Sequence, residues 1–137
     1  MVIEDTKQLA LRFYEEALNA RDLHVLDEIL SPDFVDHLAS REDTVGIEQF
    51  RQFLGMATEA FPDMRIRVED VIAEGTKAAV RLTIMGSHEG VFLGNVQPTG
   101  KQAEWTGIDI LEMSEGKIVA RWSERDLFGL VNQLGAS

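Results

Sequence analysis

Hydrophobic and polar positions along this chain repeat with a helical period first and with a strand period afterwards. Up to residue 60 the apolar positions recur at the spacing of one helical face, and they predict helices over residues 5–20, about 23–30 and about 46–60. The first helix carries on that face Ala10, Phe13, Tyr14, Ala17 and Leu18. Ser31-Pro32 ends the second helix, because proline disfavours helix in the residue before it, and residues 33–37 read as a short extended segment.

From Met64 onward the period changes to two, which indicates half-buried strands. A first strand begins at Met64, Glu74-Gly75 fits a hairpin turn, and Lys77 to His88 forms the next strand. A turn-rich loop over 90–100 precedes a strand, a tight turn, a second strand and a short closing helix. Helices followed by such strands predict an α+β fold, in which a curved antiparallel or mixed sheet wraps around the N-terminal helices and encloses a pocket.

The last predicted strand ends with acids on an apolar face. Its even-numbered positions are Ile118, Ala120, Trp122, Glu124 and Asp126, and its odd-numbered positions are Val119, Arg121, Ser123 and Arg125. Because side chains alternate between faces, we expect Trp122, Glu124 and Asp126 to point inward and the arginines to face water. Unpaired buried charge is costly, so this face predicts a pocket in which Asp126 does chemistry. The alternative is that Asp126 caps the closing helix, which it immediately precedes.

Composition narrows the classes of function. The chain has 137 residues, which fits one domain over residues 1–137 with a sizeable core. A formal net charge of −11 weighs against nucleic acid and anionic membranes as partners, because both select basic surfaces. Neither a membrane span nor a signal-peptide pattern is present, so we expect a cytoplasmic protein that binds a neutral or weakly charged small molecule.

Three further polar residues are candidates for the pocket. His88 has the parity of its strand's apolar face and could donate a hydrogen bond to an enolate oxygen or protonate a new alcohol; the alternative is a core histidine bonded to a backbone carbonyl. His37 ends a short extended segment that could lie at the cavity rim. Glu124 shares the face of Asp126, with a salt bridge to a neighbouring arginine as its alternative.

Trp105, Trp122 and Asp109 complete the predicted pocket. The two indole rings offer apolar surface for a planar polycyclic substrate, with core or dimer-interface packing as the alternative. Asp109 lies between isoleucines in GIDIL, where a carboxylate is costly unless it is paired. A two-residue Glu115-Gly116 turn would place Asp109 opposite Trp122, and a longer bulged loop would not.

Metal and nucleotide cofactors have little support. The chain has 3 histidines and no cysteine, so thiolate ligands and disulfides are excluded, and the histidines show no paired spacing with a carboxylate. Gly94 and Gly100 lie in a loop between strands, without the following helix that a phosphate-binding loop needs. We therefore expect no metal and no cofactor.

Four segments, in order along the chain, resemble one family. FVDH at 34–37, FPD at 61–63, GSHEGVFLGNVQPTGK at 86–101 and GKIVARWSERDLFGLVNQLG at 116–135 are similar to the SnoaL-like polyketide cyclases of the nuclear transport factor 2-like superfamily of cone-shaped α+β barrels. This resemblance implies cofactor-free ring closure by an intramolecular aldol reaction on a polyketide ester. It also implies an aspartate general acid/base at the position of Asp126, and a homodimer through the outer face of the sheet.

The leading hypothesis is therefore an enzyme with Asp126 as base and His88 assisting. Fold alone does not settle function, so two rival hypotheses stand beside it. One is another reaction in the same fold, such as isomerisation, dehydration or hydrolysis of an epoxide by a water held near Asp126 and Asp109. The other is a non-catalytic binding or assembly module, in which Asp126 is only a helix cap.

Overall fold

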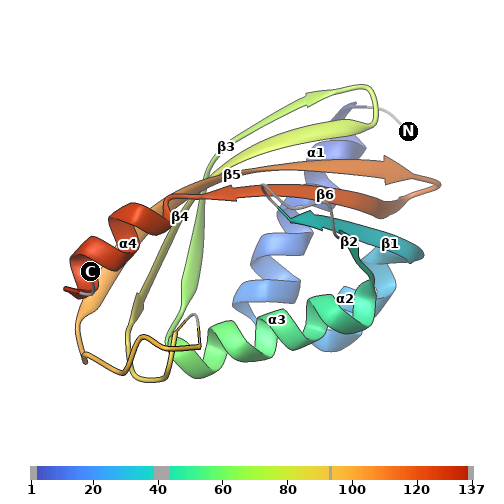
Figure 1. The fold of residues 1–137 in the computed structure, drawn as a ribbon. Coiled ribbons are helices and arrows are strands. Elements are labelled where there is room, and N and C mark those ends of the chain that lie inside the picture. Colours follow the sequence, from blue (N-terminus) through green and yellow to red (C-terminus); the bar gives the residue numbers. More distant parts are fainter. Residues whose placement is uncertain (1–2, 39–43, 93, 136–137) are drawn as a thin grey trace.

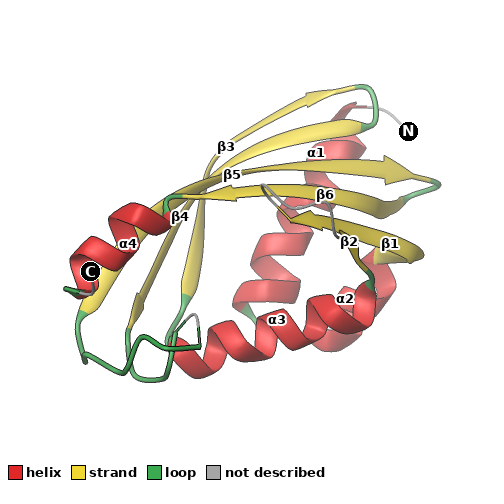
Figure 2. Cartoon of the chain, in the orientation of Figure 1, coloured by secondary structure: helices red, strands yellow, loops and turns green. Residues whose placement is uncertain are grey.

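The computed structural model describes residues 3–38, 44–92 and 94–135. Helices lie against one face of a strongly curved sheet, and the C-terminal helix packs at one end of that sheet (Figures 1 and 2). The helical elements are α1 (Ile3–Arg12), its π-helical continuation η1 (Phe13–Asn19), α2 (Leu23–Ile29), α3 (Ile47–Ala60) and α4 (Leu127–Leu134). The helices expected from the apolar period are all present, and the first spans α1 and η1 together.

Six strands form one sheet in the order β2-β1-β6-β5-β4-β3. They are β1 (Leu30–Leu38), β2 (Thr44–Val45), β3 (Arg65–Glu74), β4 (Lys77–Ser87), β5 (Gln102–Ser114) and β6 (Lys117–Arg125). β1 runs parallel to β6, and the other neighbouring pairs are antiparallel. The α+β class with a curved mixed sheet over N-terminal helices is confirmed, and the sheet is open, with β2 and β3 at its edges.

The two hairpin turns differ in how well the sequence predicts them. The turn between β3 and β4 is Gly75-Thr76, one residue later than the expected Glu74-Gly75. The turn between β5 and β6 is the expected Glu115-Gly116, because Ser114 pairs with Lys117 across it. Both of its residues have positive φ, 51° and 77°, as the two-residue hairpin turn with the twist of the strands requires.

β6 does not alternate regularly, and the predicted orientation of its side chains is wrong. The register with β5 shifts by one residue at Val119, which is left without a partner as the extra residue of a bulge. Beyond the bulge, each side chain of β6 lies on the face opposite to the one that regular alternation predicts. Arg121 is buried and Arg125 is half-buried, whereas Trp122 and Glu124 are exposed. The arginines, and not the acids, therefore point toward the helices.

The core fills the space between the helices and the concave face of the sheet. The largest of its fully buried side chains are aromatic, Tyr14, Phe13, Phe34, Phe50 and Phe61, and aliphatic side chains follow. The first helical face is buried as the apolar period predicts, since Ala10, Phe13, Tyr14 and Ala17 are inaccessible or nearly so. Within the described ranges, no helix combines the length and the apolar character that crossing a membrane requires.

Candidate active site

Five polar side chains meet on the concave face of the sheet, and we call them the inner polar cluster: Tyr14, Asp36, Asp109, Arg121 and Arg125. Asp109 is the centre of this cluster. Its Oδ2 accepts from Tyr14 Oη at 2.6 Å and from Arg121 Nε at 3.2 Å. Its Oδ1 accepts from Arg125 Nη1 at 2.6 Å. Arg121 Nη1 also donates to Asp36 Oδ2 at 3.0 Å, so the guanidinium bridges two carboxylates.

Strand pairing brings these residues together. Arg121 and Arg125 stand on either side of the position opposite Asp109, and the parallel pairing of β1 with β6 places Asp36 beside Arg121. Gly107 lies opposite Arg125, and a Cβ at Gly107 would come within 2.6 Å of the Arg125 Nη1 atom. The glycine therefore leaves open the path by which the Arg125 side chain reaches Asp109.

The pKa of Asp109 is set more by its charged partners than by its burial. Burial alone would raise the pKa of Asp109, but the charges of Arg121 and Arg125, with hydrogen bonds from Arg125 and Tyr14, hold that pKa well below its ordinary value. Burial would likewise lower the pKa of Arg121, but the charges of Asp109 and Asp36 raise it. Asp109 is therefore a fixed anion that orients its partners, and too weak a base to take a proton from carbon.

Asp36 has the opposite character. Burial raises its pKa, and the nearby charge of Arg121 offsets that effect only in part. Asp36 is 1% exposed, and its Oδ1 atom has no hydrogen-bond partner among the described residues. A buried carboxylate that holds one oxygen against Arg121 and leaves the other without a partner is a candidate for proton transfer.

The helix side of the cluster is aromatic. The guanidinium of Arg121 lies 5.9 Å from the ring centre of Phe13 and 5.3 Å from that of Phe50, within the range of cation–π contact. Burial raises the pKa of Tyr14 well above its ordinary value, and the charge of Asp109 adds to that rise. Tyr14 is therefore a neutral hydroxyl that donates to Asp109.

Asp126 lies outside the inner polar cluster, and the expectation that it points into an apolar hollow is wrong. Asp126 is exposed, and its Oδ1 accepts from the Gly129 backbone N–H at 2.9 Å as the N-cap of α4. A Cβ at Gly129 would come within 2.2 Å of Asp126 Oδ2, so the glycine makes room for this cap. The helix-cap alternative is confirmed, and the role of Asp126 as a base stays a prediction.

His37, Trp122 and Glu124 lie on the convex side of the sheet rather than in the predicted pocket. The His37 ring stacks on Trp122, with 4.7 Å between ring centres and 3° between planes. Trp122 is 39% exposed and Glu124 is exposed. For Trp122 and Glu124 the physical reason is the bulge at Val119, which turns the even-numbered positions of β6 outward. His37 follows Asp36 on β1, and because the Asp36 side chain points inward, that of His37 points outward.

Trp105 and His88 face the interior of the protein, and their roles in a substrate pocket stay predictions. His88 is fully buried and Trp105 is 7% exposed. The ring of Phe61 lies 5.4 Å from the His88 ring and 4.9 Å from the Trp105 ring, between ring centres. Both residues belong to the part of the sheet where α3 ends, away from the inner polar cluster.

Tyr14, Asp36, Arg121 and Arg125 are functional candidates that the sequence alone does not identify. The sequence feature that points toward them is Asp109. It lies in an apolar strand, and a buried carboxylate needs a cation as its partner. The arginines of the facing strand are the nearest sources of that charge. Their pairing with Asp109 becomes visible only once the bulge in β6 is known.

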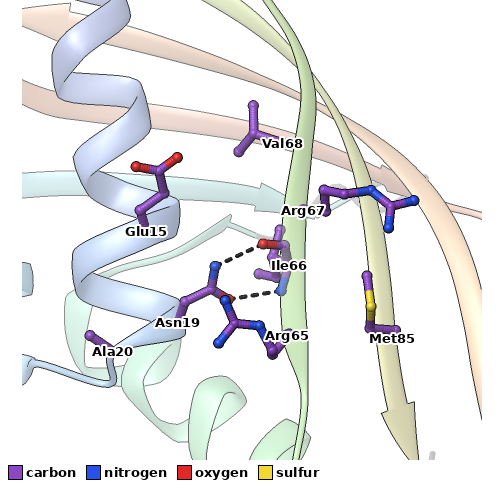
Figure 3. Close-up of a pocket in the computed structure, with 8 residues that line it drawn as sticks. All are labelled: Glu15, Asn19, Ala20, Arg65, Ile66, Arg67, Val68 and Met85. Atoms are coloured by element: carbon purple, nitrogen blue, oxygen red, sulfur yellow. Dashed lines mark hydrogen bonds between the residues drawn. The ribbon is translucent and has the colours of Figure 1, made fainter.

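Two open hollows lie elsewhere. The first, about 660 Å³, is formed between η1 and the edge strand β3 (Figure 3). Across it Asn19 Nδ2 donates to the Ile66 carbonyl at 2.7 Å, and Asn19 Oδ1 accepts from the Ile66 N–H at 2.8 Å. The second, about 420 Å³, involves β4, β5 and Gln133 of α4. Neither is lined by a predicted site residue, and the described residues contain no group of three or more potential metal ligands of the His, Cys, Asp or Glu type.

Comparisons with known proteins agree with this architecture. A family model described as SnoaL-like polyketide cyclase matches residues 8–134. A search of curated proteins found no match.

Several solved structures share the fold over nearly the whole chain. A "putative SnoaL-like polyketide cyclase" from Jannaschia sp. CCS1 is 27% identical with a TM-score of 0.90, and the match covers 99% of this chain and 95% of that one. IdmH, a "putative polyketide cyclase" from Streptomyces antibioticus, is 30% identical with a TM-score of 0.84, covering 96% and 99%. AclR, a "putative hydroxylase" from Streptomyces galilaeus, is 30% identical with a TM-score of 0.86, covering 98% and 83%. Proteins of this fold therefore carry more than one reaction name.

Proposed function

We propose that this chain, which belongs to the SnoaL-like polyketide cyclase family, closes a ring in a small carbonyl substrate by general acid–base catalysis with its own side chains. One observation carries the proposal. Asp36 Oδ1 is buried and has no partner among the described residues, while Oδ2 is held by Arg121 at 3.0 Å. This oriented carboxylate, whose pKa burial raises, has the properties that proton abstraction beside a carbonyl requires.

The proposed reaction is an intramolecular aldol addition. Asp36 takes a proton from the carbon next to one carbonyl, and the resulting enolate carbon attacks the carbon of a second carbonyl in the same molecule. One C–H bond breaks, one C–C bond forms, and the proton on Asp36 passes to the new alkoxide. The product is an isomer of the substrate, and no oxidant, reductant or added water is consumed.

Charge balance in the inner polar cluster favours the enolate. Two carboxylates, Asp36 and Asp109, and two guanidiniums, Arg121 and Arg125, sum to zero before reaction. Once Asp36 is protonated the cluster carries one net positive charge, which complements the negative charge of the enolate. Fixed charges in a water-poor site stabilise such an intermediate without reorganisation.

Product mass separates this function from hydrolysis and dehydration, and the new ring in the product separates it from isomerisation. We expect the protein to convert a keto-ester with a second carbonyl in reach of ring closure into a product of unchanged mass. In D₂O, with a substrate whose own exchange is slow, substrate recovered after partial turnover should carry deuterium at the carbon next to the carbonyl, because an enolate that does not cyclise returns to the ketone by taking up a solvent-derived deuteron there. Conversion of an aryl epoxide to a product one water heavier, or loss of one water without ring closure, would assign the same site to hydrolysis or dehydration. Binding without turnover of any of these compounds would contradict an enzymatic role.

We also propose that the convex face of the sheet forms the interface of a homodimer. Strand pairing aligns one row across five strands, the convex stripe, consisting of Ile72, Ala79, Ile110, Trp122 and His37. Ile72 is 69% exposed and Ile110 is 41% exposed, which is unusual for one continuous apolar row. On one side the stripe is flanked by Glu74, Lys77 and Glu112, and on the other by Asp70, Arg81 and Glu124. Each flank carries both signs, so a copy turned about a twofold axis can place basic residues against acidic ones.

The oligomeric state tests this interface. We expect the wild-type protein to show the mass of a dimer in light scattering after size exclusion, and Ile110→Glu to show the mass of a monomer, because the new charges would be buried against each other. Met56→Glu is the matched control, since Met56 is 59% exposed on α3, which lies on the opposite side of the sheet. A monomeric wild-type protein, or a dimeric Ile110→Glu variant, would show that the convex stripe is not the interface.

A further inference from the structure

His88 presents a hydrogen-bond donor that the protein itself does not use. The residue is fully buried, and its Nε2 atom has no hydrogen-bond partner among the described residues. A buried polar atom without a partner is costly, so native structures rarely keep one without a reason. We propose that His88 and the aromatic side chains around it form a second binding subsite, which accepts a carbonyl or other acceptor oxygen on an aromatic or conjugated ligand.

Contacts on the other side of the ring fix which nitrogen carries the proton. The Thr99 backbone N–H donates to His88 Nδ1 at 3.2 Å, and Thr99 Oγ1 lies 3.0 Å from the same atom. A backbone amide can only donate, so Nδ1 is the acceptor and the neutral ring carries its proton on Nε2. The unused atom is therefore an N–H donor, and its ligand must supply an acceptor.

The surroundings of the donor select a flat apolar group. Phe61 lies 5.4 Å from the His88 ring and Phe92 lies 6.3 Å from it, between ring centres, and Phe61 in turn packs 4.9 Å from Trp105. Aromatic rings favour stacked or edge-on contact with another ring. An acceptor oxygen attached to an aromatic or conjugated system can meet the Nε2 hydrogen and these rings together.

The wall of this subsite is held in place by the end of α3. Glu89 and Gly90 both donate backbone N–H groups to the Ala60 carbonyl, at 2.9 and 3.1 Å. A Cβ at Gly90 would come within 2.1 Å of the Glu59 carbonyl oxygen, so only glycine allows this close approach. The donor is therefore preorganised, which reduces the ordering that binding requires.

The subsite is separate from the inner polar cluster. The β4–β5 ladder runs without a break from the Val80–Asp109 pair to the Ser87–Gln102 pair, about 23 Å of paired strand, and His88 follows Ser87. His88 therefore cannot touch the atoms that react at Asp36. That separation is longer than a small carbonyl substrate, so the His88 subsite is a binding site in its own right, and it does not depend on the proposed function.

Binding of a matched pair of probes tests the subsite. Suitable probes are 2-acetylnaphthalene and 2-ethylnaphthalene, which have nearly the same shape. Only the first, a ketone, carries an acceptor oxygen. We expect the ketone to bind about five- to tenfold more tightly, the gain of one hydrogen bond. In nitrogen NMR of labelled histidine, the ketone and not the hydrocarbon should shift the Nε2 signal of His88.

Two variants of His88 separate the donor from the packing. In His88→Asn the side-chain oxygen can still accept from Thr99, but no donor remains at the Nε2 position, so the preference for the ketone should disappear. His88→Gln places an N–H donor near the Nε2 position and should keep part of the preference. Equal binding of both probes to the wild-type protein, or an unchanged preference in His88→Asn, would overturn the subsite. An Asp36→Asn variant should keep the wild-type preference, so failure of catalysis and failure of this subsite are distinguishable.

Discussion

Replacement of Asp36 by asparagine is expected to reduce turnover of a cyclising keto-ester by about 10²–10⁴-fold, the usual contribution of a positioned general base. The amide oxygen of the new side chain can still accept from Arg121, which holds Asp36 at 3.0 Å, so the cluster should keep its arrangement. Substrate binding should change little, because the lost group acts in the proton transfer. Steady-state kinetics on a folded variant, checked by circular dichroism, measures this.

The same substitution is expected not to lower stability at neutral pH. Burial raises the pKa of Asp36 in the folded protein, so the folded state binds its proton more tightly than the unfolded chain does. Stability from this group is therefore highest below the unfolded pKa and falls as pH rises through the folded pKa. The Asp36→Asn variant has no carboxyl group at this position, so its stability does not fall in this way as pH rises. Urea unfolding at several pH values should show the variant gaining on the wild type as pH rises from about 4 to 7.

Asp126→Asn decides between the two candidate bases. Asparagine is as good an N-cap as aspartate, so the variant should keep α4, where Asp126 Oδ1 accepts from Gly129 at 2.9 Å. If Asp36 is the base, Asp126→Asn should turn over at close to the wild-type rate. A strong loss in Asp126→Asn with normal turnover in Asp36→Asn would return the catalytic role to Asp126 and refute the assignment to Asp36.

Much of the fold follows from periodicity, and the failures occur where one residue changes the phase. The apolar face of the first helix is buried as its spacing predicts, and the Glu115-Gly116 turn has the expected form. Yet Asp109 lies opposite Ser123 and not Trp122, because Val119 adds one residue to β6 beyond that turn. A bulge leaves no mark in the pattern of residue types, since both faces of this strand mix polar and apolar side chains.

The site is harder to predict than the fold because the role of a polar residue depends on its partners, and the sequence does not show which residues are partners. An acid before a helix can serve as cap or base, and only the contact with Gly129 shows that Asp126 is a cap. Arginines on a strand suggest a solvent-facing side, but the buried charge of Asp109 makes their inward orientation favourable. The rule that a buried acid needs a cation predicts a partner for Asp109, and only three-dimensional pairing shows which residues supply it.

Replacement of Asp109 by asparagine is expected to lower the free energy of unfolding by about 3–5 kcal/mol, the usual cost of removing one partner from a buried ion pair. The change leaves Arg121 with Asp36 as its remaining carboxylate partner and leaves Arg125 without a carboxylate partner among the described residues. It also weakens the contact that Tyr14 Oη makes with Asp109 at 2.6 Å. The loss should appear as a lower midpoint of urea unfolding at neutral pH.

Acid titration makes the prediction for Asp109 specific. The arginine charges hold the pKa of Asp109 below its unfolded value, so its contribution is present above about pH 4 and declines as pH falls toward the folded pKa. The difference in stability between wild type and Asp109→Asn should therefore narrow in acid. Glu16→Gln is the matched control, because it removes an exposed partner of Arg12 at 3.1 Å on the helices and should cost less than about 1 kcal/mol. If both variants lost the same free energy of unfolding, the inner polar cluster would stabilise the protein no more than a surface ion pair does. Its role in holding the proposed base would then be refuted.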